Sequence, residues 1–197
     1  MEKFKNILSR ATPIPIENID TDQIIPARFL KAISREGFGE NLFRDWRYDN
    51  MNNPLPDFIL NQVDKKNKIL IAGRNFGCGS SREHAAWAIY DFGFRVVVSS
   101  FFADIFTNNA LNNGLLTIKL NEKSLNKIFD LIKKDEKTEF NVDLENQFFS
   151  TNNGSFKESF DINSFNKTCL INGYDNIDYL NSNKESILKF EKLKKYE

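Results

Sequence analysis

The sequence is poor in the residues that form disulfides and metal sites. Two cysteines, Cys78 and Cys169, and one histidine, His84, occur among 197 residues. Two cysteines that lie far apart in the chain indicate reduced thiols rather than a disulfide framework. Together with a single histidine they are also too few to close a four-ligand zinc site. We therefore expect a cytoplasmic protein with free thiols and no zinc centre.

The sequence also lacks a net charge and long apolar runs. Lys and Arg together number 27, and so do Asp and Glu. A chain without excess positive charge is a poor partner for nucleic acid or for an anionic membrane. No apolar run approaches the ~20 residues of a membrane span, and the first residues lack the apolar stretch of a secretory signal. Hydrophobic residues still make up 41% of the chain, and its length is typical of one domain over 1–197.

The middle of the sequence alternates between apolar runs and amphipathic segments. Residues 68–72 form a short continuous apolar run, which is typical of a buried strand. A Gly-rich stretch follows, and Ser80 then opens a segment with helical spacing of its apolar residues as far as Phe92. The pattern continues with strands expected over 94–99 and 115–120 and helices over 102–112 and 123–133. This order predicts an α/β fold with a parallel βαβαβ core.

The two ends of the sequence are less regular. Residues 16–25 predict a short strand or turn, a helix or loop follows from Ala27, and residues 34–56 predict an irregular surface segment. Residues 138–144 and 156–162 each alternate between apolar and polar, and the turn residues 152–155 between them predict a hairpin. Two helices, over 163–171 and 176–195, are expected to close the chain.

The most informative motif is Gly73-Arg-Asn-Phe-Gly-Cys-Gly-Ser-Ser-Arg-Glu-His-Ala85. A buried strand leads into a Gly-rich loop, and the loop leads into the N-terminus of a helix. Such a helix end presents free N–H groups and partial positive charge, so it binds anions. Arg82 adds a fork suited to a carboxylate or phosphate. The motif therefore predicts a site for a small anion.

Several familiar motifs do not fit this stretch. The pattern GxGxxG requires glycine where Arg82 stands, and neither the P-loop ending nor the GxSxG elbow is present. A serine-hydrolase triad is not expected, because the single histidine lies four residues after Ser80 on the same helix. Ser80 and Glu83 also match a plain capping box. Cys78 is either a reactive thiol at a helix end or a small packed residue, and His84 is expected to be structural.

A second motif is Ile19-Asp-Thr-Asp-Gln-Ile-Ile-Pro-Ala-Arg-Phe-Leu30. In an extended segment Asp20 and Asp22 would share one face. The alternative is an Asx-type turn before Pro26, which is a common use of aspartate. Positive charge follows at Arg28 and Lys31, beside a small apolar group.

The two motifs together resemble those of the small subunits of 3-isopropylmalate dehydratase, mobile-domain relatives in the aconitase superfamily. Further matches are Phe43-Arg-Asp-Trp-Arg47, Ser100-Phe-Phe-Ala-Asp-Ile-Phe106 and Phe140-Asn-Val-Asp-Leu144. The resemblance covers nearly the whole chain apart from about the last twenty residues. It implies a three-layer swivelling domain of β/β/α type around the parallel core.

The resemblance also implies a reaction. The family interconverts 2-isopropylmalate and 3-isopropylmalate through 2-isopropylmaleate, by dehydration and rehydration, in leucine biosynthesis. A [4Fe-4S] cluster belongs to a large partner subunit, so the resemblance implies no cofactor in this chain, a heterodimer or heterotetramer, and a small dicarboxylate as substrate. The two cysteines here could not supply three cluster thiolates.

By motif match, Ser80 is the catalytic base and Asp22 supports the catalytic machinery. Ser81 and Arg82 hold the substrate carboxylate, and Leu30 and Lys31 lie in the segment that reads the variable side chain of the substrate. Two alternatives stay open: a sister small subunit acting on homoaconitate, citramalate or a related acid, and a non-catalytic module that binds an anion at the Ser80 loop.

Overall fold

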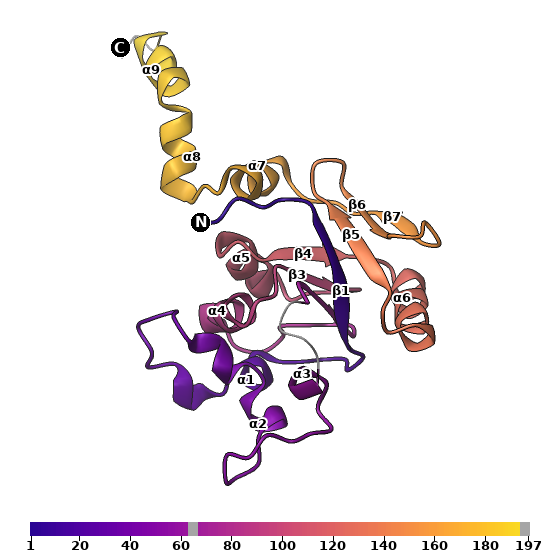
Figure 1. Ribbon diagram of the computed structural model, residues 1–197. Helices are drawn as coiled ribbons and strands as arrows, with labels where there is room; N and C mark the ends of the chain where they lie inside the picture. The colour runs from indigo at the N-terminus through magenta and orange to yellow at the C-terminus, as the bar shows by residue number, and fades with distance from the viewer. Residues whose placement is uncertain (63–66, 194–197) are drawn as a thin grey trace.

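The protein folds around one seven-stranded mixed sheet (Figure 1). The computed structural model describes residues 1–62 and 67–193. Neighbouring strands follow the order β4-β3-β2-β1-β5-β6-β7. Strands β1 to β4 run parallel, and β5, β6 and β7 continue the sheet antiparallel. The strands are β1 (Ile7–Ile14), β2 (Ile69–Ala72), β3 (Val96–Ser99), β4 (Leu116–Lys119), β5 (Glu139–Asp143), β6 (Phe148–Thr151) and β7 (Lys157–Ser159).

Helices complete the three layers. The described helices are α1 (Thr21–Ile24), η1 (Ala27–Phe29), η2 (Phe38–Asn41), α2 (Arg44–Arg47), α3 (Ile59–Gln62), α4 (Glu83–Phe92), α5 (Asp104–Asn112), α6 (Glu122–Lys134), α7 (Ser164–Asn172), α8 (Asn176–Ser182) and α9 (Lys184–Leu193). Side chains of α1, α4 and η2 share one core with the parallel strands. On the opposite face the parallel strands share a second core with α6, α7 and the curled strands β5 and β6. This arrangement confirms the predicted α/β fold with its β/β/α layers.

Alternate residues of the buried strands enter the two cores. Leu70 and Ala72 of β2 belong to the α4 side, whereas Ile69 and Ile71 belong to the α6 side. All four are fully buried. A strand covered on both faces needs apolar residues at every position, which is why residues 68–72 were recognisable as a strand. The predicted strands and helices between residues 68 and 134 are all present.

The central strand β1 was not expected from the sequence. Its residues Ile7–Arg10 pair antiparallel with β5, and Ala11–Ile14 pair parallel with β2. Polar residues and Pro13 interrupt the apolar pattern that is typical of a buried strand. The carbonyl of Ile14 accepts from Gly73 N at 3.1 Å, on the β2 side of the strand. Because successive residues of a strand alternate, the ring nitrogen of Pro13 faces the β5 side. The pairing with β5 ends at Arg10, so no strand partner lies opposite Pro13. A proline is tolerated where no ladder bond is required.

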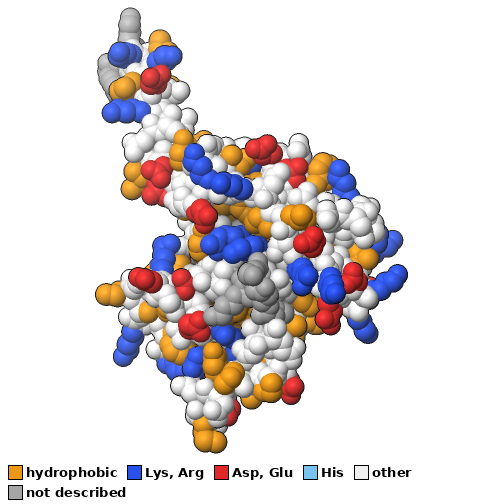
Figure 2. All heavy atoms as spheres, in the orientation of Figure 1, with side chains coloured by type: hydrophobic (Ala, Val, Ile, Leu, Met, Phe, Trp, Pro, Cys, Tyr) orange, Lys and Arg blue, Asp and Glu red, His pale blue; other side chains and the backbone are white. Residues whose placement is uncertain are grey.

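The hairpin near the C-terminus also differs from the prediction. Residues 152–155 do join two strands, but these are β6 and β7. Strand β6 was not expected from the sequence, and it pairs with β5 through a tight turn at which Gln147 has φ +58°. The helix expected over 176–195 is two helices, α8 and α9, and residues 194–195 lie outside the described part. No residue of α8 or α9 is buried, and both project from the body with hydrophobic and charged side chains intermixed (Figure 2).

Within residues 1–62 and 67–193, no helix combines the length and the apolar character needed to cross a membrane.

Candidate functional site

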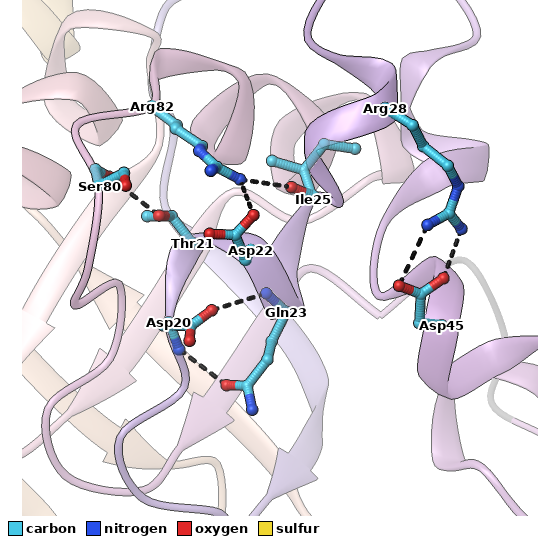
Figure 3. Close-up of polar contacts among 9 residues, drawn as sticks. All are labelled: Asp20, Thr21, Asp22, Gln23, Ile25, Arg28, Asp45, Ser80 and Arg82. Carbon is cyan, nitrogen blue, oxygen red and sulfur yellow. Dashed lines mark hydrogen bonds and ion pairs between the residues drawn. The ribbon is translucent and has the colours of Figure 1, made fainter.

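The two sequence motifs form adjoining loops at the carboxyl ends of β1 and β2 (Figure 3). Backbone hydrogen bonds join them: Gly77 N donates to Ile19 O at 2.8 Å, and Thr21 N donates to Cys78 O at 2.9 Å. The hydroxyl of Thr21 donates to the carbonyl of Ser80 at 2.9 Å. Parallel strands bring their carboxyl ends to one edge of the sheet, where α/β proteins place their ligand sites. Segments about sixty residues apart in sequence therefore make one surface.

The segment that follows Asp20 is the short helix α1 and not an extended strand. Asp20 is the N-cap of α1: its carboxylate accepts from Gln23 N at 2.8 Å, and Gln23 Oε1 accepts from Asp20 N at 2.9 Å. This reciprocal pair is a capping box. The expectation that Asp20 and Asp22 share one face of an extended segment is therefore wrong. The spacing of Asp20 and Gln23 in the sequence was the signal that would have revealed the helix.

Ser80 does not cap α4. The helix begins at Glu83 with Arg82 as its N-cap, and no side chain caps its first turn. The alternative capping box of Ser80 and Glu83 is therefore wrong, as is the expected helix start at Ser80. The carboxylate of Glu83 instead accepts from Trp87 Nε1 at 3.2 Å and from Asn113 Nδ2 at 3.0 Å. Ser80 thus lies in the loop that precedes the helix.

The Ser80 loop presents unpaired donors on an exposed surface. Ser80 and Ser81 are exposed, and their backbone N–H groups find no acceptor among the described residues. The same holds for the N–H of Arg82, and the first N–H groups of α4 point toward this loop by helix geometry. Free N–H groups at a helix start attract anions. The electrostatic potential of these N–H groups therefore favours binding of a carboxylate near Ser80.

Arg82 and Asp22 form an ion pair across the two loops. The guanidinium of Arg82 contacts the carboxylate of Asp22 and also donates to Ile25 O at 3.4 Å. The Arg82 side chain is 13% exposed, whereas that of Asp22 is 54% exposed. Arg82 is thus oriented by its partners while the carboxylate side of the pair stays open to solvent. These two predicted site residues lie together next to Ser80 (Figure 3).

Leu30 and Lys31 follow η1 beside the same surface. Leu30 is partly buried against the core of the α4 side, and Lys31 is exposed. His84 Nε2 lies 3.3 Å from the carbonyl of Ala32, and its ring packs on Trp87 with centroids 4.5 Å apart. His84 therefore ties this segment to the first turn of α4, which agrees with its expected structural role.

The pair Arg28 and Asp45 was not expected from the sequence. The two terminal nitrogens of Arg28 each donate to one carboxylate oxygen of Asp45, Nη1 to Oδ2 at 3.2 Å and Nη2 to Oδ1. The hydrogen bond from Arg28 holds the pKa of Asp45 below its usual range, so this carboxyl is charged at neutral pH. Asp45 lies in the matched motif 43–47, but its spacing from Arg28 in the sequence carries no sign of the contact.

The described residues do not fit an iron–sulfur cluster. Within the described ranges no group of three His, Cys, Asp or Glu side chains could hold a metal ion, and a cluster needs several cysteine thiolates. Cys78 lies within the Ser80 loop, where burial and the nearby Asp20 carboxylate raise the pKa of its thiol. A raised pKa disfavours the thiolate, which favours a packed residue over a reactive thiol at Cys78.

Gly77 sets the path of the Ser80 loop, and its replacement by alanine is expected to be strongly destabilising. Its φ is +75°, and a Cβ would overlap the buried ring of Phe106. Backbone strain and overpacking together should lower the free energy of unfolding by about 3 kcal/mol, as measured by urea denaturation. Gly154 is a matched control, because its φ is +74° and no atom lies within 4 Å of the position that a Cβ would take there. Equal losses in Gly77→Ala and Gly154→Ala would contradict a role for the Phe106 contact.

Comparison with known proteins shows the family of this chain. The family model of the aconitase C-terminal domain matches residues 1–123. The 3-isopropylmalate dehydratase small subunit of Cytophaga hutchinsonii is 59% identical over 196 residues, which cover 100% of this chain and 98% of that protein. The same-named protein of Christiangramia forsetii is 58% identical over 97% of this chain and 93% of its own length.

A solved structure shares the fold. The 3-isopropylmalate dehydratase LeuD of Methanocaldococcus jannaschii superposes with a TM-score of 0.66 at 25% identity, covering 95% of this chain and 99% of that one. The swivel-type α/β fold expected from the sequence is thereby confirmed. Near-complete coverage in both directions excludes a match that is limited to one shared module. The chain belongs to the family of 3-isopropylmalate dehydratase small subunits, within the aconitase superfamily.

Proposed function

We propose that this chain is the small subunit of a hydro-lyase that interconverts 2-isopropylmalate and 3-isopropylmalate through 2-isopropylmaleate in leucine biosynthesis. The observation that carries the proposal is the 59% identity over the full chain to a small subunit of that name. The joined motif loops support it, because they place an exposed hydroxyl, free N–H groups and an oriented arginine on one surface.

In this proposal Ser80 removes the proton from the carbon next to a substrate carboxylate. The electron pair of that C–H bond forms the new double bond, and hydroxide leaves the neighbouring carbon. A serine hydroxyl is a weak base at neutral pH, so its alkoxide needs stabilisation. The unpaired N–H groups of the loop and the nearby start of α4 supply positive potential for that purpose.

The remaining residues bind and orient the substrate. Ser81 and Arg82 hold a carboxylate, for which the fork of Arg82 is suited. Asp22 holds the guanidinium of Arg82 in place from the solvent side. Leu30 supplies an apolar contact for the isopropyl group, and exposed Lys31 lies next to it.

The proposed active form contains a large subunit. The site lies on an exposed surface, and the described residues do not supply a metal site of their own. A [4Fe-4S] cluster on the large subunit would supply the Lewis acid that takes the departing hydroxyl. The holoenzyme is then a heterodimer or heterotetramer in the cytoplasm. We also propose that residues 1–197 form one domain, because a single sheet runs through both halves of the chain by way of β1.

A related substrate is the second candidate. The exposed ammonium of Lys31 beside Leu30 would suit a substrate with a charged side chain, such as homoaconitate. Citramalate, with a methyl group in place of the isopropyl group, would need only the apolar contact of Leu30. One methylene of contact changes discrimination by only about 1–3 kcal/mol. A comparison of kcat/KM among these substrates therefore identifies the natural one better than the residues Leu30 and Lys31 do.

Reconstitution with the large subunit tests the function. We expect the two subunits together to convert 2-isopropylmalate to 3-isopropylmalate. The transient intermediate 2-isopropylmaleate can be monitored by its ultraviolet absorbance. The small subunit alone is expected to be inactive. Activity of the isolated chain would contradict the division of labour, and greater kcat/KM with homoaconitate or citramalate would favour the second candidate.

A further inference from the structure

We infer that Asp45, in the motif 43–47, is a positioning residue that holds the segment 27–31 in place through Arg28 and so sets substrate discrimination. This inference rests on the proposed function, in which Leu30 and Lys31 read the side chain of the substrate. The juxtaposition that carries it is the two-pronged contact between Arg28 and Asp45 (Figure 3).

The contact fixes an orientation as well as a distance. Both terminal nitrogens of Arg28 face both oxygens of Asp45. A two-pronged pair restrains rotation of the guanidinium, which a single hydrogen bond does not. Arg28 lies within η1, and Leu30 follows two residues later with its N–H bonded to Ala27 O at 3.1 Å. Restraining Arg28 therefore restrains the backbone that carries Leu30 and Lys31.

The residues on either side of Asp45 are anchored in the core. Phe43, the N-cap of α2, is fully buried, and its backbone N–H donates to Ile24 O at 2.9 Å. Its ring stacks on Trp46 with centroids 5.2 Å apart. Arg47 is buried and donates to the carbonyls of Glu40 and Leu42, both at 3.3 Å. The motif thus anchors α2 in the core while Asp45 faces outward.

The segment is held from both sides. Arg82, which precedes α4, donates to Ile25 O. From the motif 43–47, Phe43 N donates to Ile24 O, and Asp45 accepts from the side chain of Arg28. The turn at Pro26 lies between these anchors. Loss of the Arg28 contact leaves the Arg82 anchor, the packing of Leu30 and the contact of His84 with Ala32 in place, but removes the restraint on the backbone between Pro26 and Leu30.

The pair is exposed, so its main effect is not on stability. The side chains of Arg28 and Asp45 are 54% and 59% exposed. Exposed ion pairs contribute little to the free energy of folding. A positioning role therefore predicts a change in catalysis without a matching change in melting temperature.

The test uses the reconstituted holoenzyme with Asp45→Asn, which keeps the size of the side chain and removes its charge. We expect kcat/KM for 2-isopropylmalate to fall about tenfold, because small misplacements of binding groups have large kinetic effects. The ratio of kcat/KM for 2-isopropylmalate to that for citramalate should fall at least threefold, and the melting temperature should change by less than about 3 °C. Glu2→Gln is the matched control: Glu2 pairs with Arg95 at 3.6 Å away from this surface, and the substitution should leave both readouts unchanged.

A double-mutant cycle completes the test. Arg28→Ala should reproduce the effect of Asp45→Asn, and the double variant should be no worse than either single variant, because both changes remove the same contact. An unchanged ratio, additive losses, or a melting temperature lowered by more than about 5 °C would each overturn the inference. A wild-type holoenzyme without isomerase activity would instead refute the proposed function, so the two failures are distinguishable.

Discussion

Replacing Ser80 with alanine should lower kcat of the reconstituted enzyme about 10²–10⁴-fold, the usual contribution of a positioned base. The free energy of unfolding should change by no more than about 0.5 kcal/mol. The structure predicts an effect on kcat without an effect on stability, because α4 begins after Ser80 and Arg82 is its N-cap. The Ser80 hydroxyl has no hydrogen-bond partner among the described residues, so the substitution removes no contact that supports the fold.

Ser81→Ala is the neighbouring comparison. It removes the same group one residue further on, and we expect it to raise KM with a much smaller effect on kcat. Circular dichroism and urea denaturation should show that both variants fold. Retained kcat in Ser80→Ala would exclude Ser80 as the base and would favour a module that only binds an anion.

Replacing Arg82 with alanine should lower kcat/KM about 10³-fold, mainly through KM. Two charge-assisted hydrogen bonds to a carboxylate account for a loss of this size. Arg82→Lys keeps the charge but not the two-pronged geometry, so an intermediate loss is expected. The lost pair with Asp22 should lower the free energy of unfolding by about 1 kcal/mol at most, because the Asp22 side is exposed to solvent.

Arg74→Ala is the matched control for Arg82. Arg74 lies in the same loop and pairs with Glu122 at 3.4 Å, with both side chains exposed. Steady-state kinetics should show kcat/KM within about twofold of the wild type for Arg74→Ala. Equal losses in the two variants would mean that positive charge in the loop, rather than the position of Arg82, binds the substrate.

The βαβαβ core could be predicted because its strands are buried on both faces. Residues 68–72 and 94–99 are largely apolar, and such runs between amphipathic helices have few other structures open to them. Strand β1 could not be recognised in the same way. Its partners β2 and β5 come much later in the chain, and Ser9, Thr12 and Pro13 break its apolar pattern.

The candidate site shows the same division. The residue types of the motif 73–85 indicated an anion site. The capping pattern of Asp20 and Gln23 was also present in the sequence, although we predicted a short strand or a turn there rather than a helix. The contacts of Arg82 with Asp22 and of Arg28 with Asp45 were not predictable. Each contact joins two separate segments of the chain, and charges of both signs are common on any surface.

The sequence by itself determined the class of fold, the anion-binding character of the Gly-rich loop and the family resemblance, because periodicity, turn chemistry and motif spacing are local properties. Only the tertiary structure decided that α4 begins beyond Ser80, that Asp22 orients Arg82 and that Asp45 holds Arg28. The contact of Asp45 with Arg28 depends on the packing of α2 against α1, whereas the other features depend on how β1 and β2 place their loops at one edge of the sheet. That placement comes from contacts between distant segments, in which burial and backbone pairing outweigh the local preferences of each segment.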